Sequence, residues 1–447
     1  MLHPTRLRLV LPLLGFSLLA LPLVAQPATS APAAPAVVAP APEVIEVKPV
    51  AVYLTWQRDP VTTMTVHWHT DWTHGFADSV LEYRALGAAE WQRGQGEARA
   101  MPFSNRMVHT VELTGLNGDT VYEFRFGQLR ARQPDGALEF FPHEPVRKFR
   151  TLPATLSRPV RFVSGGDAYG GNTLNLFADM CRAAAAHDPE FALMGGDIAY
   201  VNNEPRAIGR WFSFFDTWGE TMVRSDGCLV PIVPAIGNHE VHGDAFAIRG
   251  GSPARGVSPD RAIQFFSLFS FPGRPGYNVL DVGDYLSLIA LDTFHANPVP
   301  GPQTDWLRTT LAQRRSVPYV IPFYHVPAYP SHRSFAGTVS VAVRANWVPL
   351  FDEAGVRFAF ENHDHTYKVT QPLRAGQPHP QGTRYLGDGA WAVSTRETTP
   401  PAQAPYLERA YSRNHVFIAT LERERAHLRA IDPKGEVFDE FSIPVRP

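Results

Sequence analysis

Short segments in the first third of the chain alternate between hydrophobic and polar residues, a pattern typical of β-strands with one buried face. The alternating segments are residues 64–68, 79–83, 108–113 and 121–126. The last one follows Asn117-Gly118, a dipeptide that favours a tight turn. No convincing amphipathic helix pattern interrupts them. Short strands at this spacing predict an all-β sandwich of the immunoglobulin or fibronectin type III kind over residues 44–153.

From Val160 onward, apolar strand patterns alternate with helical ones. Strands are predicted at residues 160–164, 191–194, 229–236, 286–291, 319–323 and 356–360. Helices are predicted at residues 174–186, 305–314 and 347–353. Near the end, Asp432-Pro433-Lys434-Gly435 predicts a hairpin between two further strands. The alternation indicates a C-terminal α/β domain over residues 159–447, whose strands lead into polar loops.

The first residues have the pattern of an export signal. Arg6 and Arg8 precede an apolar stretch at residues 9–24, which predicts a signal peptide over residues 1–25. An uncleaved anchor helix is the alternative. Residues 26–43 are rich in proline and alanine and predict an extended linker. A cleaved signal implies a secreted or periplasmic protein, and no later stretch is long and apolar enough for a stable membrane span.

Composition and charge narrow the possible partners. The 41 basic and 43 acidic residues leave a formal net charge of -2, with no long block of like charge, so nothing indicates nucleic acid or an anionic membrane as a partner. The two cysteines, Cys181 and Cys228, are compatible with one disulfide in an exported protein or with two free thiols. The oligomeric state stays open.

Polar side chains follow five of the predicted strands in the α/β domain. They are Asp167, Asp197, Tyr200, Asn238, His239, His325, His363 and His365. Sites in open α/β sheets form at the carboxyl ends of strands, so we expect these residues to converge on one edge.

Seven of these side chains are potential metal ligands: two carboxylates, one phenol, one amide oxygen and three imidazoles. Such oxygen and nitrogen donors suit Fe, Zn or Mn. Seven donors exceed the need of one ion but suit two, if one carboxylate bridges them. Two adjacent metal ions can polarise a phosphoryl oxygen and activate water for attack on it. In contrast, His67 and His69 have no acidic partners in their predicted strand and are expected on the surface or in packing. Asp388 is expected in a turn near the site.

On these residues the chain resembles the purple acid phosphatases of the metallophosphoesterase superfamily. The second of the five family blocks is intact as Gly196-Asp197-Ile198-Ala199-Tyr200, and the third as Gly237-Asn238-His239-Glu240. Tyr200 is the discriminating residue, because most metallophosphoesterases lack it. The similarity covers nearly the whole mature chain, including the fibronectin type III-like domain. It implies a four-layer α/β/β/α sandwich for the metallophosphoesterase catalytic domain.

The resemblance also implies a dinuclear centre of Fe³⁺ and a divalent ion, which is Fe, Zn or Mn. In that scheme Asp167, Tyr200 and His365 bind the ferric ion. Asp197 bridges the two metals, and Asn238, His325 and His363 bind the divalent ion. His239 contacts the substrate phosphate, and His332 is a second candidate for that contact.

Three residues depart from the family blocks. Tyr169 stands where glycine is usual, Pro322 where valine is usual, and Asn362 where glycine is usual. None of these departures removes a ligand, so they bear on substrate preference and metal identity more than on metal binding.

The resemblance implies acid phosphatase-like hydrolysis of a small phosphate monoester by a hydroxide held at the two metals. One alternative is a phosphodiesterase or nucleotide pyrophosphatase on the same fold, and the loop at residues 245–262 does not distinguish them. The other is a non-enzymatic binding protein with a decayed catalytic domain. Decay would be expected to remove a ligand, whereas all seven are present.

Overall fold

The computed structural model describes residues 49–71, 78–131, 138–241, 258–269, 276–400 and 402–446. The predicted signal peptide and linker lie outside these residues, as does most of the loop at residues 245–262. Within the described ranges, no helix has the length and apolar character needed to cross a membrane.

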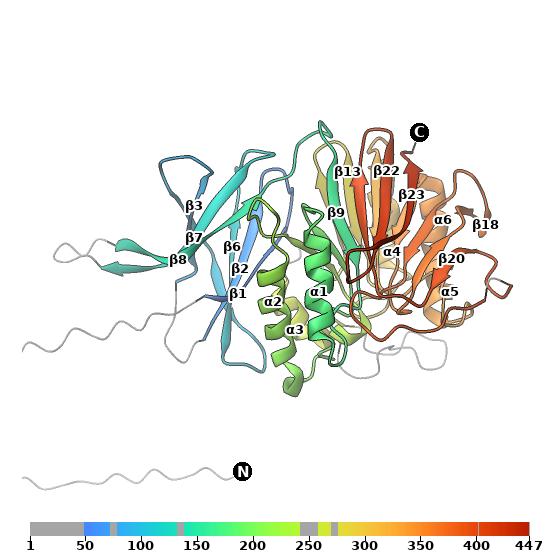
Figure 1. Ribbon diagram of the computed structural model, residues 1–447, viewed down its shortest axis with the longest axis horizontal. Helices are drawn as coiled ribbons and strands as arrows, with labels where there is room; N and C mark the ends of the chain where they lie inside the picture. Colours follow the sequence, from blue (N-terminus) through green and yellow to red (C-terminus); the bar gives the residue numbers. More distant parts are fainter. Residues whose placement is uncertain are drawn as a thin grey trace, which may run out of the picture. The chain divides into compact units, whose positions relative to one another are not determined.

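The N-terminal part is a sandwich of two antiparallel four-stranded sheets, drawn in blue and teal in Figure 1. The first sheet has the order β1 (Val50–Thr55), β2 (Met64–Asp71), β6 (Arg106–Leu113) and β5 (Glu97–Ala100). The second has the order β4 (Gln92–Gln95), β3 (Val80–Ala85), β7 (Val121–Ala131) and β8 (Leu138–Arg150). Because Val66, Trp68 and Phe124 are buried between the sheets, the alternation in the sequence does mark the inner faces. The predicted all-β sandwich is confirmed.

The C-terminal part contains two mixed sheets. The six-stranded sheet has the order β11 (Ile232–Ala235), β10 (Ala192–Gly195), β9 (Val160–Gly165), β21 (Val416–Leu421), β22 (Arg425–Ile431) and β23 (Val437–Pro444). The seven-stranded sheet has the order β12 (Asn278–Val282), β13 (Leu286–Ala290), β14 (Tyr319–Phe323), β15 (Phe358–Phe360), β19 (Arg384–Gly387), β16 (Tyr367–Thr370) and β20 (Leu407–Tyr411). The short strands β17 (Leu373–Arg374) and β18 (Gln377–Pro378) form a separate two-stranded sheet between β16 and β19 in the sequence.

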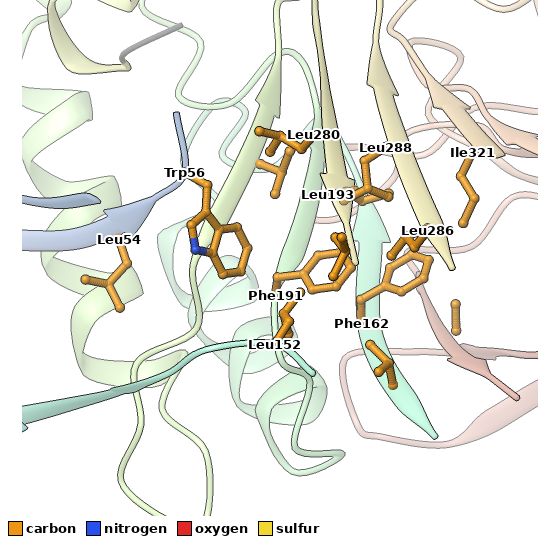
Figure 2. Packing of buried hydrophobic residues seen from close by; sticks show 14 of the residues in the cluster. Leu54, Trp56, Leu152, Phe162, Phe191, Leu193, Leu280, Leu286, Leu288 and Ile321 are labelled. Carbon is orange, nitrogen blue, oxygen red and sulfur yellow. The ribbon is translucent and has the colours of Figure 1, made fainter. Parts of the chain in front are cut away.

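The two mixed sheets pack face to face, and helices cover their outer faces (Figure 1). Between the sheets, Phe162 and Leu193 of the six-stranded sheet pack with Leu286 and Leu288 of the seven-stranded sheet (Figure 2). The helices α1 (Leu174–Ala185), α2 (Gly209–Thr221) and α3 (Ile263–Leu268) pack in the core on the outer side of the six-stranded sheet. The helices α4 (Pro302–Ala312), α5 (Thr338–Asn346) and α6 (Val348–Ala354) pack against the seven-stranded sheet. The predicted α/β/β/α sandwich is therefore confirmed.

The sandwich and the α/β part share one continuous hydrophobic core. Trp56 follows β1 and its ring lies 6.0 Å from that of Phe191, beside β10 (Figure 2). The Tyr53 ring stacks on Phe215 of α2 at 3.9 Å, and its hydroxyl donates to the Leu268 carbonyl at 2.7 Å. The β-sandwich is thus packed on the α/β part by buried aromatic side chains.

Some predicted features differ in detail from the structure. The strand expected at residues 229–236 is shorter: Ile232–Ala235 form the ladder with β10, and Leu229 forms only an isolated bridge with Val223. Cys181 and Cys228 are both buried and free, so no disulfide joins them. His67 and His69 are fully buried in β2, in agreement with a packing role.

Candidate metal centre

The strand topology brings the chemically active loops together. Strands β9, β10 and β11 are parallel neighbours in one sheet, and β14 and β15 are parallel neighbours in the other. Backbone bonds join the loops beyond these strands: Asp167 N–H donates to the Gly196 carbonyl at 3.0 Å, and Asn362 N–H to the His325 carbonyl at 2.9 Å. The loops therefore form one connected rim at the carboxyl ends of the strands.

Asp167, Tyr200 and His365 form one group of donors. The Tyr200 hydroxyl donates to Asp167 Oδ1 at 2.9 Å and lies 3.1 Å from His365 Nε2. His365 Nε2 is itself 3.0 Å from Asp167 Oδ1. The other ring nitrogen of His365 lies 3.2 Å from the Ser394 carbonyl, which fixes the ring with Nε2 toward the carboxylate.

Asp197, Asn238, His325 and His363 form a second group around one atom, His325 Nε2. This atom lies 3.1 Å from Asp197 Oδ2, 3.0 Å from Asn238 Oδ1 and 3.0 Å from His363 Nδ1. His325 Nδ1 lies 3.0 Å from the Gly195 carbonyl, which orients the ring. One ligand atom each from Asp197, His325 and His363 lies within 4.8 Å of the others.

The two groups adjoin each other. The His363 backbone N–H, in the second group, donates to Asp167 Oδ2 of the first at 2.9 Å. The charge of Asp197 also acts on Tyr200, because it is one of the causes that raise the pKa of the phenol. The structure thus brings all seven predicted ligands into one buried cluster.

The electrostatics of this cluster fit a cation. Burial favours a neutral Asp197, yet the imidazoles of His325 and His239 hold its pKa below the usual range. Burial and the carboxylate of Asp167 raise the pKa of Tyr200, so a phenolate there needs a nearby positive charge. A single proton on His325 Nε2 can satisfy only one of the three acceptors that surround it. A metal ion would satisfy such converging lone pairs together, so the residues present fit a metal centre.

The backbone at this cluster is unusual. Five of the seven residues have positive φ angles: Asp167 (54°), Asp197 (53°), Tyr200 (53°), His363 (83°) and His365 (60°). Residues other than glycine rarely adopt this left-handed backbone conformation, because it costs free energy. Where it does occur, it is concentrated at functional sites. Contacts with the surrounding structure therefore hold these five residues in a backbone conformation that is locally unfavourable, as is common at functional sites.

The structure separates the two predicted phosphate-contacting histidines. The His239 ring lies 4.1 Å from the Tyr200 ring, its Nε2 is 3.8 Å from Asp197 Oδ2, and its side chain is 31% exposed. The exposed His332 ring instead has its Nδ1 2.7 Å from the Glu397 carbonyl. Among the described contacts, none joins the His332 ring to the seven donors. His239 therefore contacts the cluster directly, whereas the described contact of the His332 ring is with the Glu397 carbonyl.

Several residues that support the cluster were missed by sequence reasoning. Glu240 accepts backbone N–H bonds from Asp197 at 2.8 Å, Ile198 at 2.7 Å and Gly237 at 2.7 Å. Asn202 Oδ1 lies 2.5 Å from His239 Nδ1. The position of Glu240 after Gly-Asn-His was a usable signal, whereas nothing in the sequence marked Asn202.

Arg210 of α2 is another supporting residue without a sequence signal. Its guanidinium donates to the carbonyls of Ala199 at 2.6 Å, Gly171 at 2.9 Å and Tyr169. It also lies 4.1 Å from the Tyr169 ring centre. The departure at Tyr169 is thereby explained, because this ring packs between Arg210 and Phe177.

The departure at Asn362 also has a structural reason. Its side-chain amide donates to the Tyr324 carbonyl at 2.8 Å and lies against Gly166 and Gly195. A Cβ on Gly195 would be 1.9 Å from Asn362 Nδ2, so only glycine fits opposite this asparagine. Asn362 therefore binds the ends of three strands together.

Asp388 has a larger role than the expected turn. Its carboxylate is buried and lies 3.1 Å from Lys368 Nζ, which also donates to Glu361 at 2.6 Å. Its backbone carbonyl accepts the His365 N–H at 2.9 Å. This buried ion cluster thus contacts the histidine loop, which is the loop of His363 and His365 after β15, through the backbone of Asp388.

Comparisons with known proteins agree with this architecture. Residues 49–151 match the family described as purple acid phosphatase, N-terminal domain, and residues 166–367 match the calcineurin-like phosphoesterases. Two uncharacterized Mycobacterium tuberculosis proteins are each 27% identical over 349 residues, which is 72% of this chain and 62% of theirs. Purple acid phosphatase 15 of Arabidopsis thaliana is 24% identical over 316 residues, 64% of this chain and 54% of that protein. The chain thus spans less than two thirds of these relatives' lengths.

Two solved structures share the fold. A purple acid phosphatase from yellow lupin (Lupinus luteus) seeds superposes with a TM-score of 0.72 at 16% identity, over 89% of this chain and 74% of that one. PhoD superposes with a TM-score of 0.63 at 12% identity, over 90% of each chain. At such identities the likeness is one of fold alone. With both family matches in chain order on this fold, the chain belongs to the purple acid phosphatase type of metallophosphoesterase, a purple acid phosphatase N-terminal domain followed by a calcineurin-like phosphoesterase domain.

Proposed function

We propose that this protein hydrolyses phosphate monoesters at a dinuclear centre of Fe³⁺ and a divalent ion, Fe, Zn or Mn. The observation that carries the proposal is the convergence of seven donors from five loops into two adjoining buried groups. Asp167, Tyr200 and His365 would hold the ferric ion, and Asn238, His325 and His363 the divalent ion. Asp197 would bridge them.

When bound, the metal pair supplies a polarised phosphoryl oxygen and an activated water. The chain supplies orientation, because the carbonyls of Gly195 and Ser394 fix the rings of His325 and His365. Asn202 Oδ1 accepts a hydrogen bond from His239 Nδ1–H, so Nε2 is the nitrogen that faces the site. A protonated Nε2 would donate to the leaving oxygen of the ester.

The alternatives from the sequence differ in their expected substrates. A phosphodiesterase or nucleotide pyrophosphatase would prefer diesters or anhydrides, and a binding protein would hydrolyse nothing. The retention of all seven donors in contact with one another supports an enzyme over a binding protein. The experiment is therefore a comparison of phenyl phosphate with bis(phenyl) phosphate on the metal-loaded full chain, with monoester hydrolysis expected to be faster.

The role of His239 gives a sharper test of this function. His239→Ala should lower kcat for phenyl phosphate by roughly 100-fold to 10,000-fold, the range for loss of a general acid. Its metal content should stay at the wild-type value, because His239 is not a proposed ligand. His332→Ala is the matched comparison and should have a smaller effect, since the described contact of its ring is with the Glu397 carbonyl and not with one of the seven donors. Equal losses in both variants would contradict the assigned roles.

We also propose that the mature chain is secreted or periplasmic. The support is the predicted signal peptide over residues 1–25. N-terminal sequencing of the protein from a periplasmic fraction should begin after Ala25, and an intact Met1 on cytoplasmic protein would contradict this.

A further inference from the structure

Two arginines on the rim of the metal centre contact the backbone of a proposed ligand but are not proposed ligands themselves. Arg333 Nη1 donates to the His363 carbonyl at 2.5 Å, and Arg396 Nη1 donates to the same oxygen at 3.4 Å. Since both guanidinium groups contact one carbonyl oxygen, they lie close together beside a proposed ligand. Both side chains are partly exposed and can be reached from solvent.

The segment that carries Arg396 is fixed on both sides. At one end, the Ser394 carbonyl lies 3.2 Å from His365 Nδ1, and the Arg396 N–H donates to the His365 carbonyl at 3.1 Å. At the other end, the Thr399 N–H donates to the Ser331 carbonyl at 2.7 Å. Arg396 is therefore held between the histidine loop and the loop of His332.

The two arginines differ in how their charge is balanced. Arg333 pairs with the buried Asp364 at 2.9 Å. Arg396 forms no ion pair with any residue in the part of the chain that the structure describes. An uncompensated guanidinium of this kind at a catalytic rim is suited to an anionic ligand.

We propose that Arg396, with Arg333 beside it, binds a second anionic group of the substrate. The enzyme would then favour phosphate esters and anhydrides whose leaving group carries a further phosphate. This inference rests on the proposed function and adds a substrate class to it. A planar guanidinium can bind two phosphate oxygens at once, whereas the proposed metal ions bind the phosphate that reacts.

The test separates charge from a structural role at Arg396. Arg396→Gln keeps a donor for the His363 carbonyl but removes the charge. The ratio of kcat/KM for fructose 1,6-bisphosphate to that for phenyl phosphate should fall roughly 10-fold to 100-fold, as expected for loss of a charged hydrogen bond. Arg308→Gln, on the exposed face of α4, removes the same charge elsewhere and should leave the ratio unchanged. An unchanged ratio in Arg396→Gln would overturn the proposal.

A binding measurement distinguishes this inference from the proposed function. Titration calorimetry of the metal-loaded protein should give a stronger preference for methylenediphosphonate over methylphosphonate in the wild type than in Arg396→Gln, by about tenfold or more. If the wild type hydrolyses no ester but shows this difference, the proposed function fails and the anion site stands. If hydrolysis occurs and the preference is the same in both proteins, the anion site is wrong and the phosphatase stands.

Discussion

At the scale of single residues, the candidate metal site is built from side chains on a strained backbone. Asp197 and Tyr200 both have φ near 53°, and each follows a strand that ends at Gly195. Their positions are set by contacts from elsewhere, such as the bonds from Asp197 and Ile198 N–H to Glu240. The strained geometry thus depends on neighbours that carry no ligand themselves.

Tyr200 gives the most specific spectroscopic prediction. A phenolate bound to ferric iron should produce a visible charge-transfer band, so oxidised, iron-loaded protein should be violet. Tyr200→Phe removes one oxygen and little volume, so it should lose the band while remaining folded by circular dichroism. Iron has to be measured in the same sample, because zinc or manganese alone would give no colour. A wild type with iron but no band, or a band unchanged in Tyr200→Phe, would refute the assignment.

Arg210 is predicted to position Tyr200 from outside the cluster. Arg210→Met retains the aliphatic part of the side chain but loses the bonds to the carbonyls of Ala199, Gly171 and Tyr169. Metal affinity should fall roughly 10-fold to 100-fold, as for other partners that orient ligands, and the visible band should shift. Arg206→Met, at an exposed position nearby, is the control and should change neither. If Arg210→Met kept the wild-type metal affinity and spectrum, the hydrogen bonds of Arg210 would not be needed to position Tyr200.

Sequence reasoning pointed to the seven converging side chains because each one follows an apolar strand or a glycine turn closely in the sequence. It did not find Arg210 or Asn202, because their contacts depend on how α2 and a neighbouring loop fold back over the site. It also did not indicate the contact of the His332 ring with the Glu397 carbonyl. Contacts between distant segments are therefore what the sequence left undetermined.

At the scale of elements, the most apolar strands were the easiest to predict. The strand at Tyr319–Phe323 has the predicted bounds, and α1 differs from its prediction by one residue. In contrast, α2 and β21 were not predicted. The apolar run of α2 is aromatic, and such a short run is compatible with either a helix or a strand when only the sequence is known. Its aromatic residues include Trp211, Phe214, Phe215 and Trp218. Strand β21 is central in its sheet, between β9 and β22, although it comes late in the chain.

The buried histidines of the sandwich predict a loss of stability in acid. His109, in β6, stacks on Trp68 at 4.8 Å, and burial lowers its pKa to about 4 from 6.5. Between pH 6.5 and 4, His109 binds a proton in the unfolded chain but stays neutral in the folded chain. The free energy of unfolding should therefore fall as pH falls from 6.5 to 4, by about 1.4 kcal/mol per pH unit for this group.

Substitution of His109 tests this linkage. His109→Phe preserves the stack on Trp68 but loses the contacts with Thr70 and Ser79, so it should be less stable at pH 7. Its stability should fall less steeply than that of the wild type between pH 6.5 and 4, measured by urea unfolding. Parallel curves for His109→Phe and wild type would contradict the linkage.

At the scale of the whole molecule, the sandwich carries none of the proposed ligands but shares its core with the phosphoesterase domain. The shift from alternating to βα patterns was enough to predict both parts and their order. The aromatic contact between Tyr53 and Phe215 was not predictable, because it joins a strand to a helix that the sequence did not reveal. The family resemblance supplied the layer arrangement that the residue pattern left open.

The metal content per chain tests the central claim of a dinuclear centre most directly. After loading with iron and zinc and removal of free ions, elemental analysis of the wild type should give two metal ions per chain. Asp197→Ala should give clearly fewer than two, because Asp197 is proposed to contact both ions. Asp305→Ala, an exposed carboxylate on α4, should still give two. One ion or none in the wild type, or two tightly bound ions in Asp197→Ala, would contradict the account.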